Sequence, residues 1–237
     1  GQPDMARPRS TPLTVDGVDL PLDLIVSPRA RRLALRLDPA AGTVRVVAPA
    51  TAGAAEIARF VARHAGWVAS RLAALPDRRP FADAAAVPYL GVDHVVRHVA
   101  GGRRPVERAG GEFRVAGGRE HLPRRLRDYL AAQARRELSR RSRAKAAAIG
   151  RAVAAVAVRD QTSRWGSCSP TGRLNYSWRL ILAPETVLDY VVAHEVAHLA
   201  EMNHGPRFWR LVETLHDRVP DARAWLKTHG AALHRYG

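Results

Sequence analysis

The hydrophobic and polar positions of the chain predict short strands and one helix in its first half, followed by a long helix. Residues 54–75 repeat apolar side chains at intervals of three and four, which is helix spacing, and residues 122–149 form a longer helical stretch. Before and between these segments, branched apolar residues bounded by turn residues indicate strands. The expected strands cover residues 22–26, 32–37, 43–48, 87–90, 94–99 and 112–115, with a hairpin turn at 39–42.

The pattern changes near residue 156. Residues 156–160 and 174–182 have strand-like composition, and residues 169–172 supply the residues of a turn between them. Pro184 is favoured in the first turn of a helix that runs to about Met202. This helix is apolar around most of its circumference, which is typical of a helix buried in a domain. Two later helices are expected to open at Pro206 and Pro220.

The buried helix carries His194 and His198, which lie one helical turn apart and can both point at one cation. Neutral imidazole is a good zinc ligand, and three protein ligands leave a fourth position for water, whose pKa zinc lowers to about 7. On an unbroken helix His204 would point away from His194 and His198. The helix must therefore end between His198 and His204, so that His204 lies on a turn and can reach the same cation. Glu195, beside the histidines, can take the proton of that water. The sequence therefore predicts a zinc-dependent hydrolase.

Four nearby residues are candidates for contact with the substrate: Arg164, Trp165, Tyr190 and Asn203. Arg164 can bind a phosphate or a carboxylate. Trp165 can stack on a base, and packing in the hydrophobic core is the alternative role for this tryptophan. Tyr190, Asn203 and Arg164 are alternatives for stabilising an oxyanion, and nothing in the sequence chooses between them. An edge strand in the segment before the helix can pair with an extended substrate backbone.

This region resembles the YgjP-like metallopeptidase domain, a family related to the SprT-like and WLM zinc peptidases. The resemblance is close over residues 156–212 and looser upstream. It implies a zincin-type catalytic domain in which His194, His198 and His204 bind zinc and Glu195 is the catalytic base. The residues that carry it are Arg164-Trp165-Gly166-Ser167-Cys168, Trp178 to Pro184, Asp189 to Val192, His194-Glu195-x-x-His198-Leu199, Met202-Asn203-His204 and Phe208-Trp209.

The resemblance leaves the substrate open. Members are named metallopeptidases by motif, while a YgjP-type protein has also been assigned a nucleotide pyrophosphatase activity that converts UTP to UMP and pyrophosphate. The same zinc site serves both reactions because each needs a polarised electrophile and an activated water. We expect peptide-bond hydrolysis with a single zinc ion, and nucleotide hydrolysis is the alternative.

Charge adds a third class of function. The net charge is +16, and 27 of the 38 basic residues lie in residues 1–150. Many of them fall on the helix expected at residues 122–149, which can bind nucleic acid or another polyanion through phosphate neutralisation. The same arginines can also form an ordinary solvated face, because arginine dominates the basic residues throughout the chain.

Three segments are expected in an α+β fold. Residues 1–12 are polar and Pro-rich and suggest a disordered tail, residues 13–120 form a strand-rich region with one helix, and residues 121–237 form a zincin-like catalytic domain that includes the basic helix. No apolar run approaches the about 18 residues of a membrane helix, so no membrane partner is expected. The single cysteine, Cys168, fits a reducing, cytoplasmic location; it is expected as a packed residue, with a fourth zinc ligand as the alternative.

Overall fold

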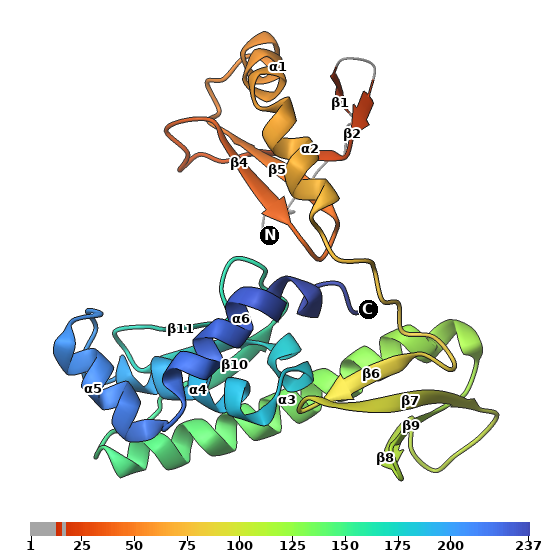
Figure 1. The fold of residues 1–237 in the computed structure, drawn as a ribbon, viewed down its shortest axis with the longest axis vertical. Helices are drawn as coiled ribbons and strands as arrows, with labels where there is room; N and C mark the ends of the chain where they lie inside the picture. Colours follow the sequence, from red (N-terminus) through yellow and green to blue (C-terminus); the bar gives the residue numbers. More distant parts are fainter. Residues whose placement is uncertain (1–12, 16–17) are drawn as a thin grey trace, which may run out of the picture. The chain divides into compact units, whose positions relative to one another are not determined.

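The computed structural model describes residues 13–15 and 18–237, so the tail expected at residues 1–12 lies outside it. These residues form an α+β protein whose chain divides into two compact units, residues 1–76 and 77–237 (Figure 1). Across the described part of the chain, no helix has the length and hydrophobicity needed to cross a membrane.

The first unit is a three-stranded sheet with a pair of helices. Strand β5 lies in the middle and pairs in parallel with β3 and antiparallel with β4. Its alternate residues Val44 and Val46 are buried against Leu22, Val61 and Val68, which form the core of this unit. The elements are β1 (Leu13–Val15), β2 (Val18–Leu20), β3 (Leu22–Val26), β4 (Ala34–Asp38), β5 (Thr43–Ala48), α1 (Ala54–Arg63) and α2 (Ala65–Ala73).

Strands β3, β4 and β5 and the turn between β4 and β5 confirm the sequence pattern, whereas β1 and β2 were not predicted and the helix differs. The pattern predicts one helix over residues 54–75, whereas the structure interrupts it at His64. The His64 ring nitrogen Nδ1 lies 2.8 Å from the Phe60 carbonyl oxygen, which a continuous helix would offer to the backbone N–H of residue 64. That N–H bonds to the Val61 carbonyl instead, at 3.0 Å.

The second unit begins with a four-stranded sheet of order β6-β7-β9-β8. Three of these strands were predicted, and β8 was not, because only Val106 of its four residues is buried and no apolar alternation marks it. Phe113 and Val115 of β9 are fully buried beneath the long helix α3. The elements are β6 (Ala86–Tyr89), β7 (Val92–Val99), β8 (Val106–Ala109), β9 (Glu112–Ala116) and α3 (Leu122–Ala148).

Helix α3 connects this sheet to the rest of the unit (Figure 1). It buries every fourth residue, and since four residues turn a helix by about 400°, the buried stripe winds around its axis. Its first turns pack on β8 and β9, and later turns pack on α4 (Glu185–Ala197). The buried residues are Leu122, Leu126, Leu130, Ala134, Leu138, Ser142 and Ala146.

A second sheet of this unit has the order β10-β12-β11, so β11 (Gly166–Cys168) is an edge strand. β12 (Arg173–Ser177) pairs in parallel with β10 (Ala155–Arg159) and antiparallel with β11. The predicted turn at residues 169–172 therefore joins β11 to β12, not the two strands that the pattern named. The second of those strands also stops at Ser177, and Trp178–Leu182 forms a short 3-10 helix, η2.

Two sets of hydrogen bonds, one made by the Ser177 side chain and one by the Arg179 guanidinium, explain why η2 forms. The Ser177 hydroxyl accepts a hydrogen bond from the Arg179 backbone N–H at 3.3 Å, which starts the turn. The buried Arg179 guanidinium then pairs with Asp160 at 2.8 Å and donates to the carbonyl oxygens of Leu233 and Tyr236. Three-dimensional contacts with the chain's last helix thus override a strand-like composition.

Three helices complete the unit: α4, α5 (Pro206–Leu215) and α6 (Val219–Leu233). Helix α4 ends at Ala197, five residues before the predicted end at Met202, because the next backbone N–H groups make shorter-range bonds such as Leu199 N–H to the Val196 carbonyl.

The predicted division between residues 120 and 121 differs from the division after Pro76 in the structure. Strands β6 to β9 share one hydrophobic core with α3, α4 and α6, so they belong to the same unit as the histidine motif.

Candidate metal centre

The three histidines of the motif converge in the second unit. Their potential ligand atoms all lie within 4.8 Å of one another, and the Nε2 atoms of His194 and His204 are 3.2 Å apart. His194 lies in the last turn of α4, His198 is the residue that caps it, and His204 lies on the turn before α5. The early end of α4 is what allows the third histidine to reach the other two.

The surroundings of the rings favour nitrogen atoms that are free to bind a cation. His198 Nδ1 lies 3.1 Å from the Glu201 carbonyl oxygen, which can only accept, so Nδ1 carries the proton and Nε2 keeps its lone pair. Phe208 of α5 is fully buried among the rings, stacked on His198 with centroids 4.5 Å apart and edge-on to His194 at 4.9 Å. These contacts hold two of the rings in place.

Burial favours the neutral form of the His194 and His198 imidazoles, which is the form that binds metal. Burial, together with the neighbouring His198, His204 and Arg223, lowers the pKa of His194 to about 4. Burial also lowers the pKa of His198 and outweighs its hydrogen bond to the Glu201 carbonyl. The three convergent imidazoles fit a divalent ion such as zinc.

Glu195 lies beside the histidines and is 6% exposed. Burial raises the pKa of its carboxyl group to about 7, and Arg164 acts in the opposite direction. The edge strand β11 passes directly over it: a Cβ atom on Gly166 would lie 2.7 Å from Glu195 Oε1. A carboxyl group with a pKa near neutrality can both accept and return a proton.

A cavity of about 310 Å³ opens in front of this carboxyl group. It brings three of the four predicted substrate residues, Arg164, Trp165 and Tyr190, together with His194 and Glu195. Asn203 is exposed and does not line it. Trp165 is half-buried and stacks on the His234 ring, with centroids 4.7 Å apart, so it also serves as a packing residue.

Asp189 and Cys168, which belong to the segments that carry the resemblance, have structural partners. Asp189 contacts Arg141 and Lys145 of α3, at 3.1 and 2.9 Å, and these contacts fix α4 to α3. Cys168 is half-buried, and its Sγ donates weakly to the Ser169 carbonyl at 3.4 Å. Burial and the nearby Glu195 raise the pKa of this thiol to about 11, and Cys168 is outside the group of convergent ligand atoms. Both residues therefore have structural contacts.

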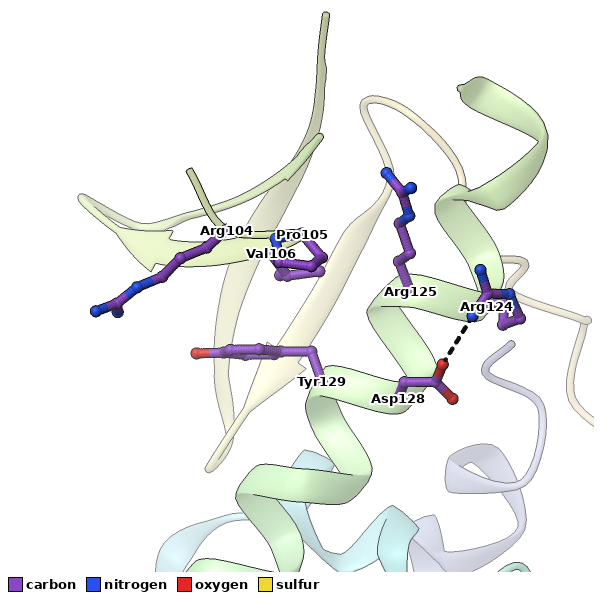
Figure 2. Close-up of a pocket in the computed structure, with 7 residues that line it drawn as sticks. All are labelled: Arg104, Pro105, Val106, Arg124, Arg125, Asp128 and Tyr129. Carbon is purple, nitrogen blue, oxygen red and sulfur yellow. Dashed lines mark hydrogen bonds and ion pairs between the residues drawn. The ribbon is translucent and has the colours of Figure 1, made fainter. Parts of the chain in front are cut away.

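A larger cavity of about 580 Å³ contains none of the histidines (Figure 2). Its guanidinium groups point apart: Arg124 pairs with Asp128 at 3.3 Å, and Arg125 donates to the Ala116 carbonyl oxygen. An anion needs donors that converge on it, and this cavity does not provide them. Its lining residues are Arg104, Pro105, Val106, Arg124, Arg125, Asp128 and Tyr129.

The sequence assigned no role in the site to three residues near the metal centre. Gly166 carries no chemical signal, since its role depends only on how close β11 passes to Glu195. The Trp209 ring centroid lies 5.8 Å from that of His194, and the Arg223 guanidinium of α6 lies over the Trp209 ring, 4.8 Å from its centroid. Gly166 and Trp209 belong to the segments that carry the family resemblance, whereas Arg223 reaches the site through tertiary packing alone.

Comparisons with known proteins agree with this geometry. The family model of the YgjP-like metallopeptidase domain matches residues 31–229, which is most of the chain. The chain belongs to the YgjP-like metallopeptidase family. Metallopeptidases are hydrolases that use a divalent metal, usually zinc, and the His194, His198 and His204 cluster of this YgjP-like domain is compatible with such an ion.

The chain has one match among solved structures and none among curated proteins. Among solved structures, the crystal structure of the metallopeptidase zymogen of Pyrococcus abyssi abylysin matches the YgjP-like chain with 21% identity and a TM-score of 0.34. The match covers 38% of this chain and 93% of abylysin.

Proposed function

We propose that the protein is a zinc metallopeptidase in which His194, His198 and His204 hold the metal and Glu195 is the general base. The observation that carries this proposal is a buried carboxyl group with a pKa near 7, placed beside three convergent imidazoles at a cavity. A bound zinc ion supplies Lewis-acid chemistry, since it makes water more acidic and polarises a carbonyl oxygen.

The edge strand β11 positions the substrate. It pairs with β12 on one side only, so its other edge can add an extended peptide as a further strand. Gly166 lies both on this strand and against Glu195, so a peptide paired there would pass in front of the carboxylate. Backbone pairing of this kind recognises a peptide without demanding one particular side chain.

Glu195 then moves the proton. Its carboxylate takes a proton from the attacking water, holds it on one oxygen, and passes it to the amine nitrogen as the peptide bond breaks. Tyr190 lines the same cavity, and burial raises the pKa of its phenol, so its hydroxyl stays protonated and can donate to the developing oxyanion. Arg164 also lines this cavity and is the alternative donor.

Metal content and activity of matched variants test the proposal. Purified wild type should contain a single zinc ion per chain, and His198→Ala should lose it. Glu195→Gln should keep the zinc and lower the turnover of an unfolded protein substrate by about 10²–10⁴-fold. Wild type without metal, or Glu195→Gln with undiminished activity, contradicts the mechanism.

A nucleotide substrate is the second candidate. The arginine, tryptophan and tyrosine that line the cavity can bind a phosphate and a base, and this observation supports hydrolysis of UTP to UMP and pyrophosphate. The same preparations should be incubated with UTP. Release of pyrophosphate that Glu195→Gln abolishes, without peptide cleavage, would replace the peptidase proposal.

A nucleic-acid partner for α3 is a separate proposal. Its later basic residues Arg141 and Lys145 are engaged by Asp189 and Glu185 of α4, which removes them from any binding face. Arg127, Arg135, Arg136 and Arg143 are exposed and form no ion pair with another described residue. Binding of DNA or RNA by Glu195→Gln that weakens steeply with added salt would support this partner.

A further inference from the structure

A second cavity of about 580 Å³ lies beside Trp209, which is one of its lining residues. Helix α6 presents Arg223 and Lys227 to it from positions four residues apart, so both side chains lie on one face. The rest of the lining is mostly apolar, apart from a single acid, Glu213. The other lining residues are Trp209, Val219, Pro220 and Ala224.

This cavity adjoins the metal centre. The Trp209 ring lies 5.8 Å from the His194 ring, and the Arg223 guanidinium carbon lies 4.8 Å from the centroid of Trp209. Leu226, between Arg223 and Lys227 in the sequence, lines the cavity in front of Glu195. One turn of α6 therefore borders both cavities.

The two cations are available to a ligand. Neither Arg223 nor Lys227 forms an ion pair within the described residues, and Glu213 forms none either. Arg223 rests with its guanidinium over an aromatic ring, an arrangement that leaves its N–H edges free to donate. A guanidinium held in this way suits the bidentate binding of a carboxylate.

We propose that Arg223 and Lys227 form an anion-binding subsite for an acidic side chain, Asp or Glu, of a peptide substrate. This inference rests on the proposed peptidase function. A peptide strand advances about 3.3 Å per residue, so a residue two or three positions from the scissile bond can reach Arg223. The apolar wall of Val219, Pro220 and Ala224 suits the methylene groups of Glu.

A carboxylate fits this subsite better than a polyphosphate. Glu213 contributes a negative charge to the same cavity, which repels a multiply charged phosphate chain more strongly than a single carboxylate. The subsite therefore selects peptides with an acidic residue near the cleaved bond.

Matched peptides test the subsite. Fluorogenic peptides that differ only in Glu, Gln or Lys at one position, scanned over three residues on each side of the scissile bond, are assayed with zinc-loaded enzyme. At one position, wild type should cleave the Glu peptide about tenfold more efficiently than the Gln peptide, through a lower KM. Arg223→Gln should reduce this ratio to about one.

Two further variants separate a role in binding from a role in packing. Lys227→Gln does not disturb Trp209 and should reduce the Glu preference in the same direction, while Arg210→Gln, an exposed change on α5 outside the cavity, should preserve it. Zinc content is measured for each variant, so that a lost preference is not mistaken for a lost metal. Equal cleavage of Glu and Gln peptides by wild type at every position overturns the subsite.

A binding measurement keeps the two proposals distinguishable. Zinc-loaded Glu195→Gln should bind a labelled Glu peptide about tenfold more tightly than its Gln counterpart in fluorescence anisotropy. If no peptide is cleaved, the peptidase proposal fails while this measurement still decides the subsite. Equal binding of the two peptides, or Arg223→Gln impairing only UTP hydrolysis, overturns the inference for acidic peptides.

Discussion

At the residue scale, the position of Glu195 depends on a glycine. Gly166 brings the backbone of β11 so close to the carboxyl group that any Cβ atom would lie 2.7 Å from Glu195 Cγ and from Oε1. Real Cβ atoms do not approach that closely, so one of the two groups must move. The end of the glutamate side chain is the more flexible partner, and it is also the group that handles the proton.

Gly166→Ala should therefore damage activity more than stability. We expect turnover to fall at least about tenfold because the carboxyl group is displaced by a distance that matters for proton transfer, while the melting temperature and the zinc content change little. Gly101→Ala is the matched control, because a Cβ atom there meets nothing within 4 Å. Full activity of Gly166→Ala, or loss of its zinc, would contradict this account of the glycine.

The sequence predicts the residues of the centre that act through local spacing. His194, His198 and Glu195 follow from one helical turn, and His204 from the turn that must follow it. Arg223 could not be found in this way, because its neighbour Trp209 lies on another helix and only packing of α6 near α4 brings it to the site. Asn203 shows the opposite error, since closeness in sequence to His204 did not place it in the cavity.

At the scale of elements, α4 is fixed by charged contacts as well as by its apolar face. Asp189 is half-buried and lies between Arg141 at 3.1 Å and Lys145 at 2.9 Å, both of which are largely buried on α3. Glu185 contacts the same arginine. Because α4 carries His194 and is capped by His198, these contacts set where the metal centre lies relative to α3.

Asp189→Ala should destabilise the fold. Its removal leaves two buried cations without their shared carboxylate, and we expect the free energy of unfolding to fall by about 2 kcal/mol. Asp128→Ala removes the exposed partner of Arg124 on α3 and should cost no more than about 0.5 kcal/mol. Urea denaturation monitored by circular dichroism compares the two variants with wild type. Equal losses would mean that the contact at Asp189 is an ordinary surface ion pair.

The sequence predicted helices and strands well where local composition determines the structure, and poorly where contacts with distant residues determine it. The long helix expected at residues 122–149 matches α3, Leu122–Ala148, almost to the residue. Residues 178–182 have a strand-like composition, yet the buried Arg179 and its contacts with Leu233 and Tyr236 turn them into a 3-10 helix. The local sequence around residues 178–182 gives no information about Leu233 and Tyr236, which lie more than 50 residues later in the chain.

At the scale of the whole molecule, the two units have separate hydrophobic cores. The core of the first unit contains residues from Leu22 to Val68, and that of the second contains residues from Phe81 to Tyr236. The C-terminus is tied into the second unit by backbone bonds from Arg79 to Arg235 at 2.8 Å and from Gly237 to Arg79 at 3.0 Å. The second unit thus begins before Arg79, and all three histidines and Glu195 belong to it.

A chain of residues 77–237 should therefore fold alone, melt in a single cooperative transition and bind zinc as the full chain does, whereas residues 121–237 should not. The shorter chain loses Phe113 and Val115 and exposes Leu122, Leu126 and Leu130, each of which contributes about 1.5–3 kcal/mol by burial. That loss is comparable to the whole stability of a domain, about 5–15 kcal/mol. Calorimetry and zinc titration of both chains make the comparison. A cooperative, zinc-binding chain of residues 121–237 would show that the β6–β9 sheet is dispensable to the metal centre.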